Sequence, residues 1–287
     1  MSAHANSETA KRPSRAGFYA IVIVGILYFV LPLIATFEFS LSMLRGIWSF
    51  EAYKSVFSDA RFRETFSFSV VAALVTIVVG SALIVPTAYW VRLKFPKLRP
   101  VVEFITLLPL VIPPIVLVFG YLRLYNSSSF LPFTGSSSGT FVLLVFGYVV
   151  LSMPYMFRAV DTGMAAIDIR TLTEAAESLG ANRITILFKV ILPNVRAAVL
   201  SGAFLSFAIV IGEFVLASLL NQPAFGPYLA LVGTHKAYEP SALAMIAFAV
   251  TWACMGLLQL AGRQRRSGQK PRRSLRSLMT FSRRARG

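Results

Sequence analysis

The stretch "EAAESLGANRITILFKVILP" occupies residues 174–193 and lies between two long apolar runs. It is one of the few mixed polar stretches in a chain that is 56% hydrophobic and only 14% charged. The mean hydropathy of +0.69 is typical of integral membrane proteins and argues against a soluble fold. The sequence therefore predicts a short acidic, alanine-rich helix that connects two membrane-spanning segments.

The apolar runs set the fold class. A spanning helix needs about 20 predominantly apolar residues. Six runs meet or approach that length: 18–37, 66–91, 104–122, 140–157, 197–220 and 242–261. These runs are continuous, whereas the strands of a membrane barrel alternate apolar and polar residues. We therefore expect an all-α, polytopic membrane protein with six transmembrane helices. The first helix should be retained, because the run 18–37 lacks the cleavage signature of a signal peptide.

Lysine and arginine gather on one side of the predicted spans. That side receives the basic residues of segments 1–16, 92–99 and 158–196 and of the tail 263–287, while the opposite side carries fewer. Because Lys and Arg concentrate in cytoplasmic loops, both termini and the loop 168–196 are expected to be cytoplasmic. The chain then divides into a cytoplasmic N-terminal tail (1–16), a six-helix domain (17–262) and a basic cytoplasmic C-terminal tail (263–287).

The formal net charge of +16 would suggest nucleic acid binding in a soluble protein. Much of this charge lies in the tail 263–287, which has two interpretations. It can orient the chain and attract anionic lipid, at about 1 kcal/mol per basic residue near the surface, or it can bind RNA or protein. The interpretation as an orienting, lipid-binding tail needs no partner beyond the membrane, so we expect membrane lipid as a partner and no nucleic acid. A single Cys254 and the separated His4 and His235 give no expectation of a metal site.

The residues around the quoted stretch predict where its helix begins and ends. Thr171 and Glu174 form a Thr-x-x-Glu capping box, so the helix should begin near Leu172. Gly180 suits the left-handed position that ends a helix. An apolar stripe follows the spacing i, i+3, i+4 and i+7: Leu172, Ala175, Ala176 and Leu179. A helix this short is marginal alone, so the stripe must pack on a partner surface or lie against the bilayer.

A second amphipathic segment starts at Asn182. One face of it would hold Ile184, Leu187, Phe188 and Ile191. Pro193 is expected to break this segment before the fifth span. The loop 168–196 is therefore predicted to contain two short helices that are separated from the next span by a proline.

The stretch 174–193 resembles the EAA loop of permease subunits of binding-protein-dependent ABC importers. The pattern of that loop is EAA, three residues, Gly, nine residues and then Ile-x-Leu-Pro. This sequence matches it at Glu174, Ala175, Ala176, Gly180, Leu192 and Pro193, and Val190 stands where the pattern has Ile. The resemblance covers roughly residues 66–261 and implies the MetI-like fold of type I ABC importers.

In that family the loop forms a coupling helix that docks into a cleft of a cytoplasmic ATPase. The resemblance therefore assigns ATPase coupling to the matched residues Glu174, Ala175, Ala176, Gly180, Leu192 and Pro193. It also implies two ATPase chains, a second permease that is expected to differ from this one, and an extracytoplasmic solute-binding protein. The chain has no Gly-x-x-x-x-Gly-Lys-Ser/Thr phosphate loop, so we expect a transport subunit rather than an enzyme, with ATP bound by the ATPase. A bacterial inner membrane location follows from the same resemblance.

Two features inside the apolar runs point to a transport path. Pro109, Pro113 and Pro114 remove backbone donors, so the third helix should be kinked or broken, as in transporter helices that line a cavity. Prolines also occur in ordinary spanning helices. Glu213 is the one acidic residue well inside a span, where an ionisable group costs about 2.5 kcal/mol or more. Its carboxylate either contacts a cationic solute or serves gating, or it bonds structurally to a neighbouring helix or a second permease.

The segments "LPLVIPPIVLVFGYL" (108–122) and "GEFVLASLL" (212–220) are similar to those of the spermidine and putrescine group of permeases. That resemblance implies a polyamine solute, and a carboxylate in the path would suit such a cation. Iron, thiamine and aminoalkylphosphonate permeases of the same importer class stay as alternatives. A secondary transporter is the rival from another class. It would need coupling-ion carboxylates or internal repeats, and apart from Glu213 the sequence shows neither.

Overall fold

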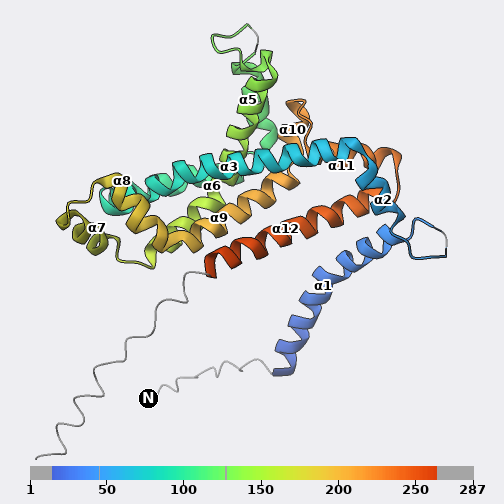
Figure 1. The fold of residues 1–287 in the computed structure, drawn as a ribbon, viewed down its shortest axis with the longest axis horizontal. Helices are drawn as coiled ribbons and strands as arrows, with labels where there is room; N and C mark the ends of the chain where they lie inside the picture. The colour runs from blue at the N-terminus through green and yellow to red at the C-terminus, as the bar shows by residue number, and fades with distance from the viewer. Residues whose placement is uncertain (1–14, 45, 127, 264–287) are drawn as a thin grey trace, which may run out of the picture.

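The computed structural model describes residues 15–44, 46–126 and 128–263, and its regular elements are helices joined by short connections (Figure 1). Apart from two short 3-10 helices they are, in chain order, α1 (Arg15–Leu41), α2 (Glu51–Ser58), α3 (Ala60–Leu93), α4 (Arg99–Val111), α5 (Pro114–Leu124), α6 (Ser137–Ala165), α7 (Ile169–Ser178), α8 (Arg183–Thr185), a π-helix (Ile186–Ile191), α9 (Leu192–Gly212), α10 (Val215–Leu219), α11 (Phe225–His235) and α12 (Glu239–Arg263). The two 3-10 helices, Pro96–Leu98 and Phe133–Gly135, precede α4 and α6. The predicted tails 1–16 and 263–287 lie almost entirely outside the described residues.

Five helical segments in the described residues are long and apolar enough to cross a membrane. They are Gly17–Leu41, Ala60–Leu93, Ser137–Ala165, Arg183–Gly212 and Glu239–Leu257. The pair α4 and α5 would make a sixth span, but its two halves are bent by 96°. The prediction of an all-α, polytopic membrane fold is confirmed, with up to six spans.

The helices α3, α6 and α9 form the centre of the bundle. They run alongside one another in Figure 1, with α12 next to α9 and α1 next to α12. With 34 residues, α3 is about 51 Å long at 1.5 Å per residue, more than a hydrocarbon core of about 30 Å requires. One hydrophobic cluster includes Leu144 and Phe225 near the end of the bundle that holds α11, and a second includes Met156 and Ile191 near the end that holds α7.

Small residues let α6 and α9 approach closely. A Cβ atom added to Gly163 of α6 would lie 2.2 Å from the Cβ of Ala198 on α9. One added to Gly202 of α9 would lie 3.2 Å from the Cα of Met156 on α6. Contacts between membrane helices commonly use small residues for this reason. Larger side chains at these positions would separate the two helices.

The first helix contributes little to this core. None of the most apolar stretch of α1 is buried, and Ile21, Tyr28 and Phe29 are 75%, 74% and 73% exposed. In Figure 1, α1 lies at the edge of the bundle and diverges from α12. A helix that is apolar all round and uncovered by its own chain suits contact with lipid or with another membrane chain.

Two of the predicted spans are interrupted in the structure. The third is broken where the prolines predict, because α4 ends at Val111 and α5 begins at Pro114. The prediction of a continuous fifth span over 197–220 is wrong, because α9 ends at Gly212 and the short α10 follows. Glu213 adopts an extended backbone there, with φ −79° and ψ 133°, which ends the helical ladder.

Gly163→Leu is expected to lower the free energy of unfolding by about 1–3 kcal/mol, because a large side chain must enter the tight contact with Ala198. Thermal unfolding of the purified chain in detergent measures the change. Gly120→Leu on α5 is the matched control, since nothing lies within 4 Å of a Cβ atom at that position. Equal effects of the two substitutions would contradict the close packing of α6 on α9.

Candidate functional site

The polar helix α7 begins earlier than predicted, and a different residue caps it. The Thr171 hydroxyl donates to Oδ2 of Asp168 (2.7 Å), and the Thr171 backbone N–H donates to Oδ1 (3.1 Å). These two bonds hold the pKa of Asp168 below its ordinary value. The predicted capping box is therefore wrong, because Asp168 takes the Thr171 hydroxyl. Glu174 pairs instead with Nε of Arg170 at 2.8 Å.

The end of α7 agrees with the prediction. Gly180 has a φ of +77°, in the left-handed region. Its N–H donates to the carbonyl of Glu177 (2.9 Å), and the N–H of Ala181 donates to the carbonyl of Ala176 (3.0 Å). This pair of bonds is a Schellman motif, which favours glycine because a side chain at that position is strained. The predicted left-handed conformation of Gly180 is confirmed.

The packed face of α7 differs from the predicted apolar stripe. Thr173 and Ala176 are buried, whereas Ala175 is exposed and Leu179 is 89% exposed. Thr173 can be buried because its hydroxyl donates to the carbonyl one turn earlier (2.7 Å) and also bonds to the hydroxyl of Tyr89 on α3 (3.2 Å). The stripe prediction is wrong for Ala175 and Leu179, and a buried polar contact joins α7 to α3.

The segment after α7 is continuous with α9. The short α8 leads into the π-helix, whose first and last residues are five apart and both fully buried, as one π turn would place them. The predicted shared face is wrong for Ile184 and Phe188, which are 70% and 60% exposed. The predicted break at Pro193 is also wrong. Local π geometry can satisfy the backbone around a proline, so the helix runs through it.

The structure places the matched motif residues in two environments. Glu174 and Ala175 lie exposed on α7 and Gly180 lies exposed in the turn after it, whereas Ala176 packs into the core at 8% exposure. At the start of α9, Leu192 is half-buried and Pro193 is exposed. The exposed group on α7 lies in the same segment as two uncovered apolar side chains, Leu179 and Ile184. Apolar groups on an otherwise polar helical surface suit a protein partner.

An ion-pair cluster that sequence reasoning missed ties three helices together near α7. Asp161 of α6 accepts from Nε of Arg92 at the end of α3 (2.5 Å) and from Nη2 of Arg99 at the start of α4 (3.1 Å). The side chain of Asp161 is 14% exposed and that of Arg92 is 18% exposed. A shielded carboxylate with two guanidinium partners is held more firmly than a surface pair. The available signal was an acidic residue at the end of an apolar run, with basic residues in the turn 92–99.

The first helix break joins α4 to α5. The N–H of Ile112 donates to the carbonyl of Leu108 (3.0 Å) to close α4, and the N–H of Val116 donates to the carbonyl of Pro113 (3.0 Å) to open α5. Pro113 has an extended backbone, with φ −59° and ψ 141°. Pro113 and Pro114 carry no N–H, so the bend leaves no donor unsatisfied at either residue. A role for these prolines in a transport path stays a prediction.

The second break joins α9 to α10, and Glu213 stabilises it. Its Oε1 accepts from the N–H of Leu216 (2.9 Å), and its Oε2 accepts from the N–H of Ala217 (3.3 Å). Glu213 is 8% exposed, and the buried Tyr148 hydroxyl lies beside its carboxylate without a well-formed hydrogen bond. A Cβ at Gly226 would lie 2.2 Å from the Glu213 carbonyl oxygen, so α11 begins tight against the break. A contact between Glu213 and solute stays a prediction.

The two short helices that follow these breaks meet. In Figure 1, α5 and α10 project from the same side of the bundle, and they are in contact. Their meeting point lies over Gly147 of α6. A Cβ there would lie 2.2 Å from Cδ2 of Leu216 on α10 and 3.5 Å from Cε2 of Tyr121 on α5. α5 and α10 therefore meet in the bundle, although the interruptions that precede them are far apart in the sequence.

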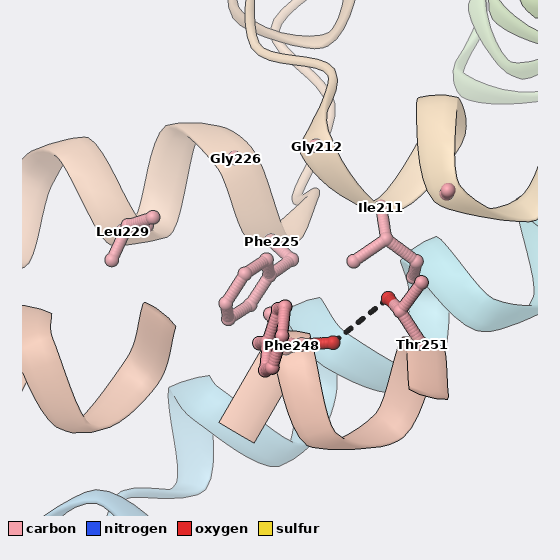
Figure 2. Close-up of a pocket in the computed structure, with 9 residues that line it drawn as sticks. Ile211, Gly212, Phe225, Gly226, Leu229, Phe248 and Thr251 are labelled. Atoms are coloured by element: carbon pink, nitrogen blue, oxygen red, sulfur yellow. Dashed lines mark hydrogen bonds between the residues drawn. The ribbon is translucent and has the colours of Figure 1, made fainter. Parts of the chain in front are cut away.

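A pocket of about 290 Å³ lies next to the second break, between α9, α11 and α12 (Figure 2). Its lining consists of Ala208, Ile211, Gly212, Phe225, Gly226, Leu229, Ala247, Phe248 and Thr251. In Figure 2, Ile211, Phe225 and Phe248 converge from the three helices. The hydroxyl of Thr251 donates to the carbonyl of Ala247 (2.8 Å), and the lining residues carry no charge. The pocket thus offers no charged side chain that would pair with a charged solute.

Long apolar helices, two of the predicted spans being interrupted, together with a partly exposed polar helix, define a multi-pass membrane protein. The chain belongs to the family of binding-protein-dependent transport system inner membrane components, whose family model matches residues 80–267. It is therefore an ABC importer permease of the MetI type and a transport component rather than an enzyme. This family is the importer class that the motif at 174–193 predicts, not a secondary transporter.

Several relatives are similar in sequence. A probable molybdenum ABC transporter permease protein of Haloferax volcanii is 36% identical over 151 residues, which are 51% of this chain and 54% of that protein. The spermidine/putrescine transport system permease protein PotC of Haemophilus influenzae is 29% identical over 258 residues, which are 86% of this chain and 95% of that protein. The molybdenum transport system permease protein ModB of Escherichia coli is 32% identical over 133 residues, which are 43% of this chain and 56% of that protein. The chain thus spans about half of these two molybdenum permeases and nearly all of PotC.

Solved structures share the fold. A bacterial ABC transporter involved in the import of the acidic polysaccharide alginate matches with a TM-score of 0.67 at 12% identity, covering 86% of this chain and 95% of that chain. The MetNI methionine ABC transporter, in an inward facing conformation, matches with a TM-score of 0.50 at 20% identity, covering 74% of this chain and 92% of that chain. At these identities the likeness concerns the fold alone.

Asp161→Asn is expected to lower the free energy of unfolding by about 1–3 kcal/mol, because two guanidinium groups lose a shielded carboxylate. Unfolding of the purified chain in detergent gives the value. Glu174→Gln is the matched control, because it breaks an exposed pair and should cost about 0.5 kcal/mol or less. If Asp161→Asn lowered the free energy of unfolding by no more than Glu174→Gln did, the cluster would not stabilise the bundle.

Proposed function

We propose that this chain is a permease subunit of an ATP-driven polyamine importer in a bacterial inner membrane. The assignment of a polyamine as the solute rests on the breadth of the match to PotC, which takes in 86% of this chain and 95% of that protein. A match of that breadth includes the helices on both sides of each break, where a path through the bundle would run. The match to the Haloferax molybdenum permease takes in 51% of this chain.

The end of the bundle that holds α7 is the proposed cytoplasmic end. Basic residues of the described chain are frequent there, including Arg92, Arg99, Arg170, Arg183 and Lys189. This distribution supports the orientation because cytoplasmic loops carry an excess of Lys and Arg. Both termini are then cytoplasmic, and the α2 and α11 end faces the solute-binding protein.

The exposed side of α7, continued by α8, is the proposed docking surface for a cytoplasmic ATPase. Ala175 has little side-chain bulk, so a partner can approach the helix closely. Leu179 and Ile184 are 89% and 70% exposed, and burying apolar area contributes about 25 cal/mol per Å². ATP would be bound and hydrolysed by that partner, because this chain has no phosphate-loop motif.

Two connections support a mechanical link from this surface to the bundle. The Tyr89–Thr173 contact joins α7 to α3. The continuous helix Arg183–Gly212 joins α8 to α9 without a loop. Because α3 and α9 are central helices, a displacement of docked α7 would be transmitted to the core rather than absorbed by a flexible linker.

The remaining partners follow from the same assignment. A second permease of different sequence would complete the path, as expected for a polyamine system. The uncovered apolar side chains of α1 would contact membrane lipid or that second permease. No cofactor is assigned to this chain.

Molybdate is the second candidate solute. It is favoured by the 36% identity to the Haloferax permease, which exceeds the 29% identity to PotC. The two solutes differ in the sign of their charge, since a polyamine is a cation and molybdate is an oxyanion. A direct comparison of uptake therefore separates them.

Proteoliposomes that contain the complete importer with its binding protein are expected to accumulate radiolabelled spermidine or putrescine when ATP is supplied. Molybdate should not accumulate above the level without ATP. The control is the same complex with its ATPase phosphate-loop lysine replaced. If the complex takes up molybdate but not polyamine, molybdate replaces polyamine as the proposed solute. If an assembled, ATP-hydrolysing complex takes up neither, both solute assignments are contradicted.

Gly180→Val is expected to weaken retention of the ATPase on the detergent-purified permease. A β-branched residue at φ +77° strains the end of α7 by about 1–2 kcal/mol, which corresponds to roughly a 5- to 30-fold change in an equilibrium. Gly180→Asn is the matched control, because asparagine tolerates the left-handed region. Copurified ATPase per permease is the readout. Unchanged retention in Gly180→Val would argue against docking through α7.

A further inference from the structure

Glu213 directs both carboxylate oxygens at the backbone of its own chain. Oε1 bonds to the N–H of Leu216 and Oε2 to the N–H of Ala217, at 2.9 and 3.3 Å. The residue is 8% exposed and lies between an extended backbone position and α10. Its side chain therefore occupies the place of an N-terminal cap rather than projecting into the 290 Å³ pocket beside it.

The helix that Glu213 caps depends on contacts with the rest of the protein. α10 has 5 residues, and a helix of that length is not stable alone. The first N–H groups of any helix have no acceptor within that helix. In a region shielded from water, another part of the protein must supply the acceptor, and a side chain is one source. Glu213 does so for two of these groups.

The capped helix is also anchored at its other end. In the turn after α10, Nε2 of Gln222 donates to the hydroxyl of Thr140 on α6 (2.8 Å). Between the two anchors, Leu216 is fully buried over Gly147 and close to Tyr121 of α5. α10 is therefore in contact with both α6 and α5, the helix beyond the proline break, and its orientation affects how α5 packs on the bundle.

We infer that Glu213 is a positioning residue of the importer. Its carboxylate holds α10 against α5 and α6 across the break, and it sets the rate of transport through that packing without binding the solute. The inference rests on the proposed transport function for its activity readout. It does not depend on which solute is carried.

The cap and a solute contact make different demands on residue 213. A cap needs an acceptor oxygen within reach of the N–H groups of Leu216 and Ala217, and the side chain of Glu213 is long enough to reach them. A contact with a cationic solute needs the negative charge. Glutamine therefore separates the two roles, because it has the length of glutamate, keeps one acceptor oxygen and removes the charge.

The experiment compares Glu213→Asp, Glu213→Gln and Glu213→Leu in the complete importer. Hydrogen exchange of the peptide covering residues 214–220 reports directly on the bonds to Leu216 and Ala217. Uptake kinetics in proteoliposomes give the maximal rate and KM separately. Tyr148→Phe is the control, since the hydroxyl that it removes lies beside Glu213 without a hydrogen-bond partner among the described residues.

With Glu213→Leu we expect exchange in 214–220 to rise about tenfold and the maximal rate to fall about tenfold, with KM unchanged, because a cap contributes roughly that factor. Glu213→Asp and Glu213→Gln should stay within about threefold of the native protein in both measurements, because each keeps an acceptor oxygen on a side chain that points toward the same N–H groups. Tyr148→Phe should leave exchange and uptake unchanged.

The inference is overturned if Glu213→Gln raises KM or loses transport while Glu213→Asp retains it, because the charge would then be the required property. It is also overturned if Glu213→Leu leaves exchange and uptake unaltered. If Glu213→Leu does not assemble, the comparison of glutamine with aspartate still decides. Should the native importer carry no polyamine, the exchange result tests the cap independently, and the KM comparison is repeated with molybdate.

Discussion

Where water is excluded, in a bilayer or in a protein core, each backbone N–H and C=O must find a partner within the protein, and this constraint decides where the chain can stop being regularly helical. The described residues meet it in three different ways. At Ile112–Pro114, the prolines have no donors to satisfy. At Glu213, a side chain supplies the acceptors that the helix lacks. At Ile186–Ile191, a widened π turn allows the helix to run through a proline. Irregular backbone thus lies where the sequence provides specific chemistry for it.

The same helices that pack the core also connect its two ends. Near α7, the Asp161 cluster joins α3, α4 and α6, and the Tyr89–Thr173 contact joins α7 to α3. Near α11, the hydroxyl of Ser69 on α3 accepts from the N–H of Phe225 at 2.8 Å. Because α3 takes part at both ends, a force applied to α7 acts on a long helix that also contacts the start of α11.

Continuous apolar runs and the prolines were enough to predict the all-α fold and the break before Pro114, because length and missing donors act locally. Gly180 was predictable for the same reason. The start of α7 was not, because Asp168 and Thr171 are both good caps and only the folded geometry shows which one is used. The buried face of α7 was missed because Thr173 becomes suited to burial only when Tyr89, distant in sequence, meets its hydroxyl. The end of α9 was missed because an apolar run gives no sign of a carboxylate turned back onto its own backbone.

The uncovered leucine and isoleucine beside α7 matter for the life of the chain before assembly. Leu179 and Ile184 protrude from a polar surface, and nothing else in the described chain shields them. If the proposed ATPase covers them, a copy synthesised without that ATPase displays these side chains to the chaperones and proteases of the cell. The cellular amount of this subunit would then be set by the supply of the ATPase, so that surplus copies are removed and subunit proportions are balanced without matched rates of synthesis.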